Sequence, residues 1–170
     1  MPRLFFALWP DQAVARRLEH AGAALQRTCG GRLARLDTLH LTLAFLGETP
    51  AERLPEALDA AATAHCAPFT LTLARVGGWA HNRIVWAAPV ETPPPLLALA
   101  RSLEAALGAR GIAFDARPFA PHVTLLRKAE RLPPVPSLPP IAWPVTDFVL
   151  VKSLPGARGA AYETLGRWPA

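Results

Sequence analysis

One pattern occurs twice in this chain and limits the folds that it can adopt. The tetrapeptides HLTL and HVTL begin at His40 and His122, 82 residues apart, and each places a threonine two residues after its histidine. Because successive side chains of a β-strand point to opposite faces, the histidine and threonine of each copy should share one face while the apolar residues between and after them enter the core. Each strand is therefore predicted to present an imidazole and a hydroxyl side by side.

An amphipathic helix is predicted before each copy. Asp11 can cap the first helix, whose apolar residues recur at helical spacing to about Arg27, before a Gly-Gly pair. The second helix, from Leu96 to Leu107, has the same apolar period and a glycine stop at Gly108 or Gly111. Two such helix–strand units predict an α+β chain of two similar lobes that face each other across a cleft. The 170 residues fit a single domain spanning 1–170.

The remaining elements follow from local composition. A further helix is predicted at about Ala51–Ala64, and Gly77 and Gly78 are assigned to a loop between two strands, together with His81 and Asn82. The proline-rich residues 133–144 are expected to form an ordered or semi-rigid loop. The strands are predicted at residues 4–10, 35–47, 69–80, 83–90, 114–128 and 146–155, with a short last strand that ends near Trp168.

Composition and charge narrow the functional classes. The apolar fraction of 51% and the charged fraction of 18% are typical of a globular chain. No apolar run approaches the roughly 20 residues that span a bilayer, and no signal peptide is recognised, so a cytoplasmic protein without a membrane partner is expected. The formal charge of +5, mostly from arginine, suits a polyanion such as RNA, although a GC-rich genome would also produce this composition. Cys29 and Cys66 lack a CxxC spacing and are expected to be reduced thiols.

Two histidines and two hydroxyls on opposing strands suit displacement at phosphorus. One imidazole can act as a base while the other acts as an acid near neutral pH, and the hydroxyls can donate to oxygens on which negative charge grows. Arg127 could also reach that anion, but its odd offset from His122 turns it to the other strand face unless the strand ends or bulges near Leu126. A single HxT histidine is more often structural. A metal site is disfavoured, since each strand supplies one imidazole and no other ligand, so no cofactor is expected.

HLTLAFLG and PHVTLLRK resemble the paired HxTx motifs of the two-histidine phosphoesterase superfamily. The wider pattern, with RLFFALWP, RIVWA and the closing LVKSLPGARGAAYETLGRWP, is similar to its bacterial branch of RNA 2′,3′-cyclic phosphodiesterases, also named 2′-5′ RNA ligases. The resemblance implies pseudo-twofold symmetry, with antiparallel sheets, outer helices and a metal-independent site in the cleft between the lobes. It also implies hydrolysis of an RNA 2′,3′-cyclic phosphate to a 2′-phosphomonoester.

The resemblance further implies a role for each site residue. His40 would be the proton donor to O3′ and His122 the proton acceptor from water. Thr42, Thr124 and Arg127 would hold the phosphate. Phe45, which strict alternation puts on the core side, is similar to a position near the terminal base.

Two alternative functions fit the same residues. The same chemistry run in reverse would join RNA ends as a 2′-5′ ligase. A non-catalytic module could bind nucleotides or RNA ends through the same residues, although two intact HxT motifs argue against it. The expected partner is RNA with a 2′,3′-cyclic phosphate terminus or a small cyclic nucleotide, and the chain is expected to act as a monomer.

Overall fold

The computed structural model describes residues 1–64 and 67–169. The expectation of a reduced thiol at Cys66 therefore lies outside the described residues, while Cys29 is a buried free cysteine. Helix α1 spans Gln12–Cys29, α2 spans Leu54–Thr63 and α3 spans Pro94–Ala109. The strands are β1 (Arg3–Leu8), β2 (Arg32–Leu33), β3 (Leu41–Glu48), β4 (Phe69–Trp79), β5 (Ile84–Ala88), β6 (Val123–Arg127), β7 (Ser137–Val145), β8 (Asp147–Leu154) and β9 (Ala161–Pro169).

The strands form one antiparallel sheet made of two four-stranded halves. Their order is β7-β4-β5-β6-β3-β1-β8-β9, with β2 paired to β6 outside this path. The halves β6-β5-β4-β7 and β3-β1-β8-β9 meet where Leu41 of β3 pairs with Val123 of β6. The predicted α+β class with antiparallel sheets and outer helices is confirmed. The two HxT strands are neighbours at the middle of the sheet.

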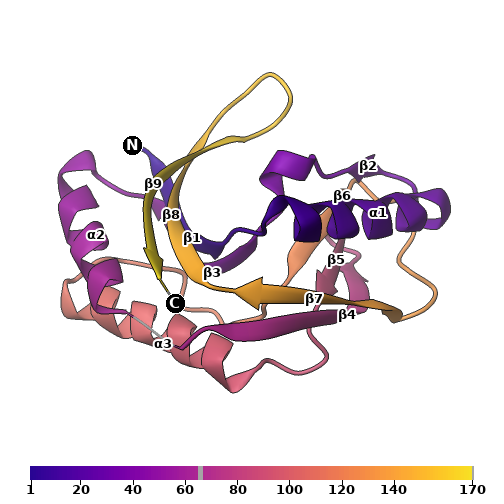
Figure 1. Cartoon of the computed structure of the whole chain (residues 1–170). Helices are drawn as coiled ribbons and strands as arrows, with labels where there is room; N and C mark the ends of the chain where they lie inside the picture. The colour runs from indigo at the N-terminus through magenta and orange to yellow at the C-terminus, as the bar shows by residue number, and fades with distance from the viewer. Residues whose placement is uncertain (65–66, 170) are drawn as a thin grey trace.

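Helices α1 and α3 each cover the half of the sheet that does not contain the strand preceding them in the chain. Helix α1 follows β1 in the chain, yet it packs against β6 and β7 of the other half, whereas α3 follows β5 and packs against β3 (Figure 1). Helix α2 packs against α3 and β9. Each helix that precedes an HxT strand thus covers the opposite half of the sheet, so the two halves share a core.

Caps at both ends fix the length of α1. The Asp11 carboxylate accepts a hydrogen bond from the Val14 amide at 2.9 Å, and the Gly30 amide donates to the Gln26 carbonyl at 2.8 Å. At Gly31 the φ of +86° is left-handed, and an added Cβ would lie 2.6 Å from the Arg127 carbonyl oxygen. A glycine is needed there because the chain turns back against β6 to form β2.

Two loop predictions were wrong. Gly77 and Gly78 lie within β4, where Gly77 pairs with Trp86 and an added Cβ would lie 2.5 Å from the indole ring. These glycines make room for a tryptophan rather than for a turn. The proline-rich segment contains β7, which pairs with β4 at the end of the sheet, and proline is tolerated in a strand at such an edge.

Several helix and strand boundaries also differ from those predicted. The helix expected from Ala51 begins as a 3-10 turn, Ala51–Arg53, before α2, and the strand expected from residue 114 begins only at Val123. The strand expected from residue 35 begins at Leu41, after a 3-10 turn at Leu36–Thr38. The last strand, β9, has 9 residues and pairs along β8. A small apolar cluster of Phe5, Ala7, Val149 and Val151 lies apart from the main core, with Trp9 and Tyr162 packed against it.

Candidate active site

The pairing at the centre of the sheet brings the two motifs together. Leu41 and Val123 are partners and fully buried. In an antiparallel register, one step to either side places His40 opposite Thr124 and Thr42 opposite His122. The four polar side chains therefore alternate on one sheet face, which we call the histidine face, while the apolar pair between them enters the core.

Both imidazoles are oriented by the same kind of hydrogen bond. The Nδ1 of His40 lies 2.7 Å from the Thr38 carbonyl oxygen, and the Nδ1 of His122 lies 2.8 Å from the Ala120 carbonyl oxygen. A carbonyl oxygen only accepts, so Nδ1 carries the proton and donates it in both rings. Nε2 is left without a proton in the neutral ring. Each Nε2 can take a proton as a base or, once protonated, give one as an acid.

The surroundings of the two rings differ. Trp9 stacks on His40 with ring centroids 5.0 Å apart and an angle of 6° between the planes. Phe5 and Tyr162 close two more sides of this ring, at 5.0 Å and 5.4 Å. The aromatic ring near His122 is that of Trp79, which meets it edge-on at 4.7 Å. His40 is thus the more enclosed of the two histidines.

This enclosure sets the protonation of both histidines. Burial lowers the pKa of His40 to about 4, opposed by the hydrogen bond to Thr38 and assisted by the charges of Arg127 and His122. Burial also lowers the pKa of His122, opposed by the Ala120 carbonyl and assisted by Arg127. Both rings are therefore neutral at neutral pH in the ligand-free protein. A bound anion would offset the charge of Arg127 and raise both pKa values.

A β-bulge corrects the prediction for Phe45. Thr42 pairs with Ala7 and Ala44 pairs with Phe6, so Leu43 is an extra residue in β3 and the alternation changes phase. Phe45 is consequently 36% exposed rather than in the core. It pairs with Phe5, whose ring contacts His40, and the Arg3 guanidinium lies 5.8 Å above its ring. Phe45 therefore lies on the histidine face.

A second bulge turns Arg127 to the same face. Thr124 pairs with Trp86 and Leu126 with Val85, so Leu125 is the extra residue in β6. Leu125 and Leu126 are both fully buried, and the exposed Arg127 follows them. The bulge that the sequence required near Leu126 is present. Arg127 is placed as far after His122 as Phe45 is after His40, so an arginine and a phenylalanine take equivalent places in the two motifs.

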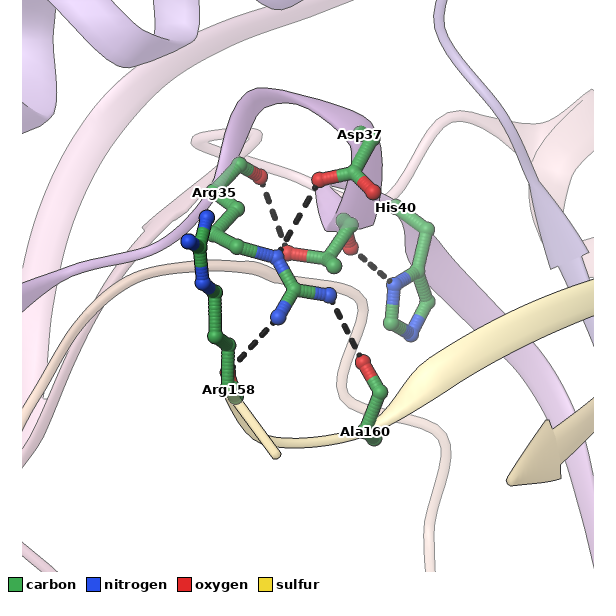
Figure 2. A network of polar contacts seen from close by, with 6 residues as sticks. Arg35, Asp37, His40, Arg158 and Ala160 are labelled. Atoms are coloured by element: carbon green, nitrogen blue, oxygen red, sulfur yellow. Dashed lines mark hydrogen bonds and ion pairs between the residues drawn. The ribbon is translucent and has the colours of Figure 1, made fainter. Parts of the chain in front are cut away.

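A polar network holds the turn before His40 (Figure 2). Arg35 donates to the carbonyls of Arg158 and Ala160 at 2.6 and 2.8 Å and forms an ion pair with Asp37 at 3.3 Å. The Arg35 carbonyl in turn accepts from the Thr38 hydroxyl at 2.9 Å. The short turn that orients His40 is therefore tied to the loop between β8 and β9.

Sequence reasoning found the two motifs but missed the groups around them. Trp9 continues the alternation of Phe5 and Ala7, so the strand pattern could have placed it on the same face. Tyr162 and Arg35 gave no signal, because their contacts join segments far apart in the chain.

Residues 1–64 and 67–169 contain no group of three His, Cys, Asp or Glu side chains that could hold a metal ion. None of the helices described is long and apolar enough to cross a membrane.

Paired histidines and hydroxyls beside an arginine are the groups that acid–base chemistry on a phosphate ester requires. A sequence model described as "LigT like Phosphoesterase" matches the chain twice, at residues 8–86 and 87–162. The chain belongs to this family of two-histidine phosphoesterases, whose members are hydrolytic.

Relatives across the whole chain bear the same kind of name. The RNA 2′,3′-cyclic phosphodiesterase of Escherichia coli (strain K12) is 38% identical over 98% of this chain and 95% of its own length. That of Thermus thermophilus is 34% identical over 98% and 89%. A crystal structure of E. coli LigT complexed with 3′-AMP matches with a TM-score of 0.88 and 37% identity, covering 99% of this chain and 98% of that one.

Proposed function

We propose that this protein hydrolyses RNA 2′,3′-cyclic phosphate ends to 2′-phosphomonoesters. The observation that carries the proposal is the arrangement of His40 and His122, each with Nδ1 bonded to a carbonyl and each opposite the threonine of the other motif. The names of the E. coli and T. thermophilus relatives support this substrate class.

In the proposed reaction, Nε2 of His122 takes a proton from water and the hydroxide oxygen attacks phosphorus. The bond from phosphorus to O3′ breaks, and Nε2 of protonated His40 gives its proton to the leaving O3′. The phosphate remains on O2′. Thr42, Thr124 and Arg127 donate to the non-bridging oxygens, where negative charge grows. No metal ion takes part.

His40 has to become protonated when the substrate binds. The pKa of His40 is about 4 without ligand, so the ring is neutral at neutral pH. The negative phosphate stabilises the imidazolium and offsets the charge of Arg127, which raises the pKa of His40 in the complex. Substrate binding thus prepares the acid. Phe45, on the same face, is proposed to contact the terminal base.

The first experiment uses a short RNA with a 2′,3′-cyclic phosphate end, in EDTA, with the product assigned by phosphorus NMR. We expect a 2′-phosphate from the wild type and a loss of at least about a hundredfold in kcat for His40→Ala and His122→Ala. His20→Ala is the matched control, since His20 is an exposed histidine of α1. Full activity in either site variant, or binding without turnover by the wild type, would contradict the proposal.

A sulfur substitution separates the two histidine roles. Replacing the bridging O3′ by sulfur provides a leaving group that needs little protonation. We expect this substrate to restore much of the activity of His40→Ala but not that of His122→Ala. If the sulfur substrate restored the activity of His122→Ala alone, His122 would be the acid and His40 the base.

A further inference from the structure

Strands β2 and β6 place two arginines side by side. Arg32 and Arg127 are partners in this antiparallel pair, and both side chains are exposed. Cross-strand partners project from the same face of a sheet, so Arg32 lies on the histidine face beside Arg127. The next pair, Leu33 and Leu126, faces the core: Leu126 is fully buried, and a Cβ added at Gly22 of α1 would lie 2.7 Å from Leu33.

This pair of like charges has no acidic partner in the part of the chain that the structure describes. The ion pairs found in residues 1–64 and 67–169 involve other arginines: Arg35, Arg53, Arg117 and Arg167. Like charges directly opposite each other destabilise a sheet. An anion bound between the two guanidinium groups would remove this repulsion.

The position of the two arginines indicates which anion they bind. The bulge in β6 turns Arg127 to the histidine face, and its charge lowers the pKa of both His40 and His122, so its guanidinium is on the side of the sheet where the reacting phosphate would bind. Arg32 lies on β2, which pairs with the same edge of β6 as β3 does, but further along β6 than the two motifs. Guanidinium groups bind phosphate oxygens two at a time. In an RNA strand, the phosphate next to the reacting one would contact both arginines.

We propose that Arg32 and Arg127 bind the phosphodiester on O5′ of the terminal nucleoside, so that the protein recognises an RNA strand rather than its cyclic end alone. This inference rests on the proposed function. Arg127 contacts the reacting phosphate and the outer one, whereas Arg32 contacts the outer phosphate alone. The two arginines therefore determine selectivity for a substrate with a second phosphate.

The test compares a nucleoside 2′,3′-cyclic phosphate with the dinucleotide that ends in the same cyclic nucleotide. We expect the wild type to prefer the dinucleotide in kcat/KM, and Arg32→Ala to lower that preference about tenfold. Arg101→Ala removes an exposed arginine of α3 and controls for the loss of net charge. It should leave the preference unchanged. An unchanged preference in Arg32→Ala would overturn the proposal.

A binding measurement needs no turnover and separates this proposal from the proposed function. Calorimetry would compare a nucleoside 2′-monophosphate with the 2′,5′-bisphosphate, in the wild type and in Arg32→Ala. If the wild type hydrolyses no cyclic phosphate, the proposed function fails, yet an affinity gain from the 5′-phosphate that Arg32→Ala abolishes supports the second phosphate site. An effect of Arg32→Ala on the bisphosphate but not on the dinucleotide would overturn the assignment to an RNA strand.

Discussion

His40 shows how packing alone can set the chemistry of a residue. Its ring is enclosed by Trp9, Phe5 and Tyr162, and its Nδ1 proton is held by a main-chain carbonyl. The apolar rings disfavour the charged form, while the carbonyl favours it. Because burial is the largest cause of the low pKa, removing an aromatic neighbour should matter more than removing a distant charge.

A titration of the histidine signals by NMR tests this account. We expect a pKa of about 4 for His40 in the ligand-free protein. Trp9→Ala should raise the pKa towards its ordinary value, because water then reaches the imidazolium. An unshifted His40 signal in Trp9→Ala would show that burial by Trp9 does not set this pKa.

The lowered pKa values of His40 and His122 also predict how the activity depends on pH. In kcat/KM, which reports the free enzyme, the proposed acid is deprotonated as pH rises above its low pKa, so the alkaline limb should begin below the ordinary histidine range. In kcat, which reports the complex, bound phosphate raises both pKa values and both limbs should lie at higher pH. Coincident limbs in the two profiles would argue against substrate-assisted protonation.

At the scale of elements, Arg35 joins two segments that the strands do not join. It links the 3-10 turn Leu36–Thr38 to the loop between β8 and β9, and β9 carries Tyr162 to the ring of His40. The loop residues themselves are exposed. The Arg35 contacts therefore connect the position of Tyr162 to the turn that orients His40.

Arg35→Ala should free the loop and, through Tyr162, loosen the packing around His40. We expect faster amide exchange at residues 156–161, a loss of about 1 kcal/mol of stability and a several-fold fall in kcat. Arg35→Lys should not restore slow exchange, since lysine lacks the fork that reaches two carbonyls. Arg17→Ala, at an exposed position of α1, is the control. Unchanged exchange in Arg35→Ala would contradict this role.

Strand alternation predicted the elements of the site well where the strands are regular. It placed His40 with Thr42 and His122 with Thr124, and the central register bears this out. It misplaced Phe45, because an extra residue in β3 changes the phase. Bulges depend on the partner strand, which local sequence does not specify. For the same reason β7 was not predicted: its prolines suggest a loop, and only the pairing with β4 makes this segment a strand.

At the scale of the whole molecule, the exchange of helices makes the two halves depend on each other. The family model matches each half of the sequence separately. In space, however, α1 covers β6 and β7 while α3 covers β3, and β1 pairs with β8. Neither half of the sequence contains a complete layer of strands with its own helix.

Fragments 1–90 and 91–170 test this dependence, since the cut falls between β5 and α3 at the exposed pair Val90 and Glu91. We expect each fragment alone to lack dispersed amide signals, because its apolar helix face has no partner. An equimolar mixture should regain the spectrum of the full chain. A well-dispersed spectrum from either fragment alone would contradict the expectation.

The hydrogen bonds that orient the two imidazoles end on main-chain oxygens, and this has a consequence for how the site can evolve. A carbonyl is present whatever side chain its residue carries, and the two copies already differ here, with threonine at 38 and alanine at 120. Drift at these positions leaves the acceptor in place. The acceptor that orients each histidine is thus inherited with the path of the chain rather than with a particular side chain.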